Sequence, residues 1–167
     1  MRRLHLLRHA KSSWDDPALP DHDRPLAPRG RRAAARLAGW LEDNEVRPQL
    51  VLCSTAKRAR DTLALLTGSL GEPPASLEDD LYHASATGLL ARIRDVDDEV
   101  QEAMLIGHNP ALQELCLLLA AASPERDGVA GKLPTGALVS LELDIDDWAD
   151  AGRGRARIVG LVRPRDL

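Results

Sequence analysis

Three short segments of the sequence place arginine or histidine where side chains could do chemistry. Arg8 and His9 close an apolar run that begins at Leu4, Arg58 comes shortly after a second run, and His108 closes a third. An arginine fork stays charged at physiological pH and binds phosphoryl oxygens in bidentate fashion. A neutral imidazole is a competent nucleophile near pH 7, because its unperturbed pKa is about 6.5. Two arginines and two histidines around one crevice would form a phosphate-binding site that contains a nucleophile.

Each of these segments follows a stretch that is typical of a buried β-strand. The apolar runs over residues 4–8, 50–53 and 103–107 are short and are closed by polar or small residues. A helical pattern follows each run. In a parallel α/β sheet, the junctions between strands and helices lie at the same edge of the sheet. The four candidate side chains are therefore expected to converge on one point.

The rest of the chain completes an α/β pattern without repeats or linkers. A long aperiodic loop over residues 11–28 follows the Arg8-His9 strand directly, so it is expected to form one wall of the site. The other expected elements are helices at 31–45, about 56–70, 87–94 and 111–122, strands at 76–81, 137–143 and 157–162, and a loop at 124–132. The prediction is an α/β fold, a three-layer αβα sandwich with a mostly parallel central sheet and helices on both faces. Residues 1–167 are expected to form a single compact domain.

Two local features have simple structural interpretations. Ser54 or Thr55 is expected to cap the helix that follows the second strand. The basic face formed by Arg29, Arg32 and Arg36 on the first helix is interpreted as a solvated surface rather than a binding patch.

Composition excludes several classes of function. The chain is 44% hydrophobic and 29% charged, with a net charge of −4, one Tyr, three Trp and no Phe. The scarcity of aromatic side chains disfavours base stacking, and the negative net charge disfavours general binding to a polyanion. No nucleic-acid partner is therefore expected. The longest apolar segment, residues 115–122, is too short to span a membrane. Cys53 and Cys116 lack metal-ligand spacing, so neither a metal nor a cofactor is expected. No signal peptide is evident, so a cytoplasmic location is expected.

Three motifs follow one another along the chain: Arg8-His9-Ala10, Ser54-x-Ala56-x-Arg58-Ala59-x-x-Thr62 and Gly107-His108-Asn109-Pro110. Together they resemble the histidine phosphatase (phosphoglycerate-mutase-like) superfamily. Further stretches resemble its short SixA-type branch, which is named for phosphohistidine phosphatase activity: residues 8–14, 81–85, 107–110 and 133–137. The resemblance runs in order from residue 3 to at least residue 143.

The resemblance implies a role for each of the four candidate residues. His9 would be the nucleophile and would form a phosphohistidine intermediate. Arg8 and Arg58 would bind the phosphoryl oxygens, and His108 would donate a further hydrogen bond to the phosphoryl group. The chain departs from the usual Arg-His-Gly signature, because Ala10 stands in the third place.

A second departure concerns the proton donor to the leaving group. Many members of the superfamily carry a Glu where this sequence has His83, with Asp79 and Asp80 just upstream. A protonated His83 could act as the acid, one of the aspartates could, or the acid could be absent. Lys11 and Ser12, next to the Arg-His pair, are further candidates for substrate binding.

The lack of a Glu at the proton-donor position favours one substrate class over another. An alkoxide leaving group needs an acid, whereas the imidazole of a protonated phosphohistidine departs neutral. The prediction is a metal-independent phosphatase that acts on phosphohistidine in a protein and releases inorganic phosphate. The alternatives are a phosphatase of a small phosphomonoester and a non-catalytic module that binds phosphate or a phosphoprotein on the same fold.

Overall fold

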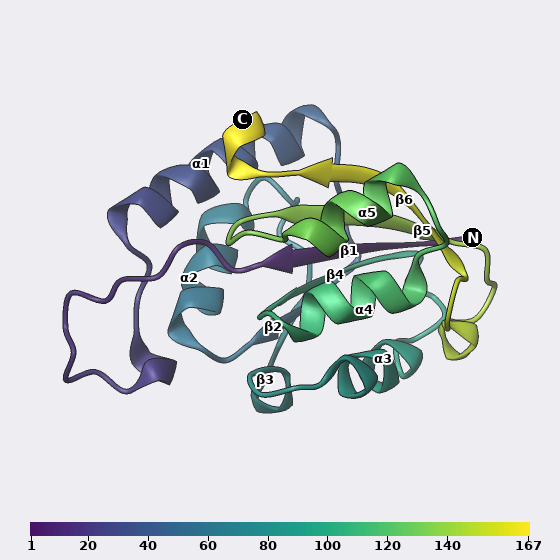
Figure 1. Ribbon diagram of the computed structural model, residues 1–167, viewed down its shortest axis with the longest axis horizontal. Helices are drawn as coiled ribbons and strands as arrows, with labels where there is room; N and C mark the ends of the chain where they lie inside the picture. Colours follow the sequence, from purple (N-terminus) through teal and green to yellow (C-terminus); the bar gives the residue numbers. More distant parts are fainter.

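A computed structural model describes residues 1–167, and its six strands form one mixed sheet (Figure 1). The strands are β1 (Arg2–Arg8), β2 (Leu50–Ser54), β3 (Ala75–Glu78), β4 (Glu102–Gly107), β5 (Leu138–Leu143) and β6 (Ala156–Val162). Their order across the sheet is β3-β2-β4-β1-β5-β6. The first four strands are parallel, while β5 runs antiparallel to β1 and β6 antiparallel to β5. The expectation of a mostly parallel sheet is confirmed.

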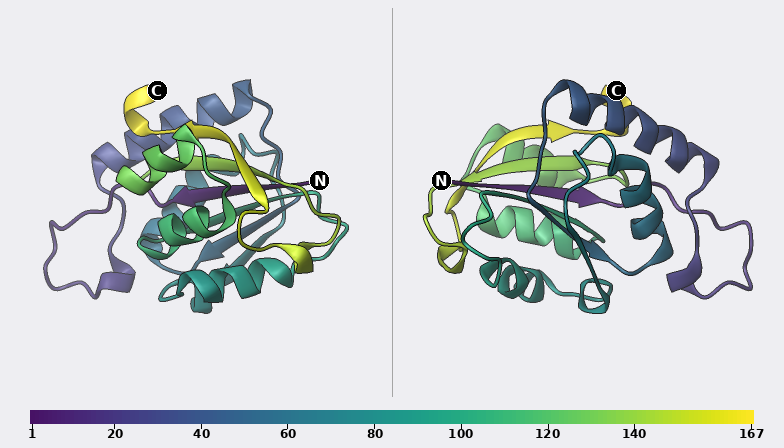
Figure 2. Two further views of the ribbon diagram at one scale, coloured as in Figure 1. Left: turned by 45° about the vertical axis from the view of Figure 1, so that its right-hand side comes forward. Right: turned by 180° about the vertical axis from the view of Figure 1, so that it is seen from behind.

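Helices cover both faces of this sheet (Figures 1 and 2). Helices α1 and α2 lie on one face, and α3, α4 and α5 lie on the other. Their bounds are α1 (Pro28–Asp43), α2 (Lys57–Leu66), α3 (Ala86–Arg94), α4 (Ala111–Leu119) and α5 (Pro124–Gly131). The arrangement is the predicted three-layer αβα sandwich. No helix is both long enough and apolar enough to cross a membrane.

Alternating side chains of the strands divide the core into two layers. In β1, Leu4 and Leu6 pack with α3, α4 and α5, whereas Leu7 packs with α1 and α2. This alternation follows from the two-residue period of a strand. Because both faces of the sheet are covered, the central strands read as continuous apolar runs.

Two local expectations are wrong. Residues 124–131 form helix α5 rather than a loop, because Pro124 stands at the first helical position and the Ser123 side chain accepts a hydrogen bond from the backbone N–H of Arg126. The residue that caps α2 is Ala56 and not Ser54 or Thr55. The Ser54 hydroxyl instead accepts a hydrogen bond from the Ala56 N–H at 3.2 Å and stays free to contact another side chain.

Backbone contacts fix the loops that leave the carboxyl ends of the strands. The N–H of His9 donates to the carbonyl of Gly107 at 3.1 Å, which joins the ends of β1 and β4. The N–H of Gly136 donates to the carbonyl of His9 at 2.9 Å and ties the turn before β5 to the same point. These contacts hold together the carboxyl ends of β1 and β4 and the turn before β5.

Candidate active site

The carboxyl ends of β1, β2 and β4 surround a cavity of about 340 Å³. Seven of the nine candidate site residues line it, all but Asp79 and Asp80, and six others join them. The thirteen lining residues are Arg8, His9, Lys11, Ser12, Trp14, Asp21, Arg24, Arg58, Tyr82, His83, His108, Asn109 and Thr135. As expected, the loop over residues 11–28 forms one wall. Arrangements of this kind are typical of open α/β sheets, where ligands bind at the carboxyl ends of the strands.

One ring nitrogen of His9 is fixed by a backbone hydrogen bond, and the other carries the lone pair. It is buried, and its Nδ1 atom lies 2.7 Å from the carbonyl oxygen of Ala10. Since a carbonyl only accepts, Nδ1 carries the hydrogen and Nε2 keeps a lone pair. The Nε–H of Arg58 donates to this Nε2 atom at 3.4 Å. His9 therefore presents an oriented, unprotonated nitrogen next to a fixed cation.

The surroundings of His9 favour its neutral form. Burial, together with the positive charges of Arg58 and Arg8, lowers its pKa from 6.5 to about 4, although the hydrogen bond to Ala10 opposes this shift. At neutral pH the imidazole is uncharged. A nucleophilic nitrogen must have this protonation state.

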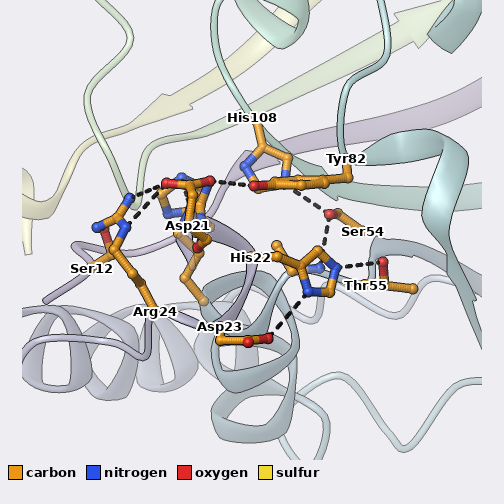
Figure 3. Close-up of polar contacts among 12 residues, drawn as sticks. Ser12, Asp21, His22, Asp23, Arg24, Ser54, Thr55, Tyr82 and His108 are labelled. Carbon is orange, nitrogen blue, oxygen red and sulfur yellow. Dashed lines mark hydrogen bonds and ion pairs between the residues drawn. The ribbon is translucent and has the colours of Figure 1, made fainter. Parts of the chain in front are cut away.

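His108 faces His9, with ring centroids 5.0 Å apart. Its Nε2 atom lies 2.8 Å from the Ser54 hydroxyl, which already accepts a hydrogen bond from Ala56 (Figure 3). Ser54 is fully buried and its hydroxyl hydrogen has no other acceptor, so this hydrogen is donated to Nε2, which places the histidine hydrogen on Nδ1. This Nδ1 atom is buried and has no partner. Burial, followed by His9 and Arg58, lowers the pKa of His108 to about 3, so this ring is also neutral.

Two arginines of the predicted set keep free hydrogen-bond donors. Arg8 donates from Nη1 to the carbonyl of Leu133 at 3.0 Å, and its Nε atom is buried without a partner. Arg58 is buried and uses one hydrogen on each terminal nitrogen for Asp21, at 2.8 Å to the carbonyl and 3.0 Å to the carboxylate. Each guanidinium still has N–H groups available for an anion.

Asp21 is one of the site residues that the sequence did not indicate. Its carboxylate accepts hydrogen bonds from Arg58, from Arg24 at 2.9 Å and 3.1 Å, and from the Tyr82 hydroxyl (Figure 3). The hydrogen bond from Tyr82, followed by those from the two arginines, holds the pKa of Asp21 well below its usual range. The group is therefore a carboxylate at neutral pH, and it occupies arginine donors of the kind that bind phosphate.

Lys11 and Ser12 lie in the cavity in different ways. The Lys11 side chain is exposed and has no ion pair. Ser12 is buried, and its hydroxyl accepts a hydrogen bond from Arg24 at 2.8 Å. Ser12 therefore positions Arg24, a third cation that no pattern in the sequence singled out.

Of the three candidates for the proton donor, only His83 lines the cavity. Its side chain is exposed, and its ring packs against Tyr82 with centroids 4.0 Å apart. Asp79 accepts a hydrogen bond from the hydroxyl of Thr55 at 2.6 Å, and neither Asp79 nor Asp80 is among the lining residues. No Glu lines the cavity.

The site can bind a compact anion and attack it. Three arginines surround two neutral histidines, and the lone pair on Nε2 of His9 accepts only the long hydrogen bond from Arg58. No group of three or more His, Cys, Asp or Glu side chains in the structure could hold a metal ion. The chemistry that the arrangement supports directly is the capture of a phosphoryl group by an imidazole nitrogen.

Comparisons with known proteins indicate the family of the chain. The family model of the Histidine phosphatase superfamily (branch 1) matches residues 4–104. An uncharacterized protein of Mycobacterium tuberculosis is 41% identical over 163 residues, covering 95% of this chain and all of the relative.

Solved structures extend the likeness to nearly the whole fold. The candidate phosphohistidine phosphatase SixA of Agrobacterium tumefaciens superposes with a TM-score of 0.85 at 29% identity, covering 98% of both chains. The protein histidine phosphatase SixA complexed with tungstate has a TM-score of 0.81 at 24% identity and covers 99% of both chains. The latter likeness concerns the fold alone.

Proposed function

This chain belongs to the histidine phosphatase superfamily, and we propose that it is a metal-independent phosphatase that removes the phosphoryl group from phosphohistidine in a protein. The observation that carries the proposal is a pair of buried N–H donors without partners, Arg8 Nε and His108 Nδ1, on residues that line the cavity with His9. Buried polar atoms are nearly always hydrogen-bonded. The oxygens of a phosphoryl group would satisfy both donors.

In the proposed reaction, Nε2 of His9 attacks the phosphorus atom in line with the leaving group. A bond forms between His9 Nε2 and phosphorus while the bond from phosphorus to the substrate imidazole breaks. The arginines bind the equatorial oxygens and stabilise the charge of the transition state. The hydrogen bond from Nδ1 to Ala10 stabilises the positive charge that His9 acquires. Water then attacks the phosphorus, the bond from phosphorus to Nε2 of His9 breaks with its electron pair returning to the nitrogen, and inorganic phosphate leaves with His9 neutral again.

The groups around the leaving-group position support phosphohistidine as the substrate. Asp21, the one carboxylate in the cavity, has a lowered pKa and cannot supply a proton at neutral pH. Tyr82 donates its hydrogen to Asp21, and burial raises its pKa further. An alkoxide would therefore depend on the exposed His83. The imidazole of a protonated phosphohistidine leaves neutral and needs no acid.

A protein substrate is favoured because the cavity is open enough for a phosphate carried on a protein surface to reach the nucleophile. The cavity opens to solvent beside exposed residues such as Trp14, Lys11 and His83. A location in the cytoplasm remains a prediction from the sequence.

The test is hydrolysis, in EDTA, of a phosphohistidine-bearing protein and of a panel of phosphomonoesters, by the wild type and by His9→Ala and His83→Ala. We expect release of phosphate from phosphohistidine that is lost in His9→Ala and kept in His83→Ala. Faster turnover of a small phosphomonoester would keep the nucleophile and overturn the substrate. Binding of phosphate without any turnover would instead indicate a non-catalytic module.

A further inference from the structure

A second, larger hollow of about 590 Å³ adjoins the candidate active site. Lys11 and Thr135 line both cavities, so the two lie next to each other. We call the second hollow the basic groove. It is lined by Lys11, Arg29, Ala33, Arg36, Gly128, Gly131, Lys132, Pro134, Thr135, Arg163, Pro164 and Arg165.

The fold brings the walls of the basic groove together around the backbone of Lys11. Helix α1 lies so close to Lys11 that a Cβ atom on Gly30 would collide with the Lys11 carbonyl. Arg29 and Arg36 are seven residues apart on α1, so they share one face of the helix. The opposite wall comes from the end of α5 and the C-terminal turn Pro164–Asp166, which lies beside α1 (Figures 1 and 2).

Charge sets the basic groove apart from the rest of the surface. Six cationic side chains line it and no acidic side chain does, although the whole chain carries a net charge of −4. Arg165 has one long ion pair, 3.9 Å to Asp166, and the other five cations have none. The three arginines of the basic helix face are exposed, as expected of a solvated surface. Arg29 and Arg36 line the groove, and only Arg32 lies outside it.

We propose that the basic groove binds an acidic segment of the phosphoprotein substrate while its phosphohistidine enters the catalytic cavity. This inference rests on the proposed function. The cations come from four separate parts of the chain and line a groove larger than the catalytic cavity, an arrangement that suits successive carboxylates along a polypeptide. A single phosphate would instead need convergent donors of the kind found around His9. Charge complementarity of this kind speeds association and selects partners.

The kinetic test uses the double variant Arg29→Glu/Arg36→Glu, with Arg32→Glu on the same helix as the matched control. The substrates are a protein whose phosphohistidine is flanked by Asp and Glu, and free phosphohistidine. At low ionic strength we expect the double variant to lose at least tenfold in kcat/KM on the acidic protein, mainly through KM. Its turnover of free phosphohistidine should stay within twofold of wild type. Arg32→Glu should match wild type on both substrates. Equal losses on both substrates, or no loss on either, would overturn the proposal.

A binding measurement separates this inference from the proposed activity. Fluorescence anisotropy with a labelled octapeptide of Glu residues needs no turnover. Wild type should bind the peptide, with an affinity that falls as salt is added. The double variant and a second variant on the opposite wall, Lys132→Glu/Arg165→Glu, should lose binding. No binding by wild type, unchanged binding by both folded variants, or binding of tripolyphosphate but not of the peptide would refute the acidic-segment proposal.

Discussion

The hydroxyl oxygen of Ser54 lies 2.8 Å from Nε2 of His108, at the junction of β2 and β4. This contact assigns the hydrogen of His108 to Nδ1, the buried atom without a partner. Ser54 thus acts on the site through His108 and is a positioning residue. The relationship connects a serine that looked like a helix cap to the donor that would face a phosphoryl oxygen.

Replacing this hydroxyl tests the relationship. In Ser54→Ala, His108 is free to adopt either tautomer, and we expect kcat/KM to fall roughly tenfold, the equivalent of one hydrogen bond. Nitrogen NMR shifts of His108 should show a mixture of tautomers in the variant and one tautomer in wild type. Thr55→Ala is the matched control, because the Thr55 hydroxyl contacts Asp79 and His22 rather than His108. A wild-type His108 that carries its hydrogen on Nε2 would contradict the assignment.

Asp21 is predicted to weaken the binding of phosphate. Its carboxylate occupies donors of Arg58 and Arg24 and repels a phosphate dianion. We expect Asp21→Asn to bind inorganic phosphate about fivefold more tightly, because an exposed ion pair contributes up to about 1 kcal/mol. Calorimetric titration with phosphate measures this, with Asp23→Asn as the control. Weaker binding by Asp21→Asn would show that the carboxylate instead organises the arginines for phosphate.

Stability should depend on pH through the buried histidines. Folding lowers the pKa of His9 from 6.5 to about 4, so between these values the unfolded chain binds more protons than the folded one. The free energy of unfolding therefore falls as the pH drops from 6.5 towards 4, by about 1.4 kcal/mol per pH unit for one such group. The lowered pKa of Asp21 acts below this window.

Urea unfolding at pH 7, 6 and 5 checks the pH dependence. His9→Asn should show a shallower loss of stability than wild type over this range. Because His9 and His108 interact, the two contributions are not additive. Parallel curves for wild type and His9→Asn would contradict the assignment of a lowered pKa to His9.

Two glycines of α1 should respond in opposite ways to the same substitution. A Cβ at Gly30 would collide with the Lys11 carbonyl, so Gly30→Ala should destabilise the fold by about 1–3 kcal/mol and disturb the site. Gly39 has open space around its Cα, so Gly39→Ala should stabilise the helix by about 0.5–1 kcal/mol. Thermal unfolding of both variants measures the difference. A tolerated Gly30→Ala would refute the close approach of α1 to the site.

The elements that carry the site could be predicted because their signals are local. Arg8, His9, Arg58 and His108 each follow an apolar run, and parallel strands bring such residues to one edge of the sheet. The structure places them around one cavity. Helix α5 was missed because its Ser-Pro start stands in a polar segment without apolar periodicity.

The remaining parts of the site could not be predicted from local patterns. Asp21 and Arg24 come from a long aperiodic loop, and Tyr82 follows a short turn after β3. Their contacts depend on how these loops fold against Arg58, which the sequence does not encode as a period or a spacing. Likewise, nothing in the pattern of α1 indicated that Arg29 and Arg36 would face the C-terminal turn across a groove.

The central claim is that Nε2 of His9 takes the phosphoryl group. The most direct measurement is mass spectrometry of the protein after rapid mixing with a phosphohistidine protein and quenching at alkaline pH, where phosphohistidine survives. We predict the added mass of one phosphoryl group on the peptide that contains His9, absent from His9→Ala and present in the control variant His83→Ala. Phosphate release by the wild type without any labelled His9, or with the label on another residue, would contradict the account.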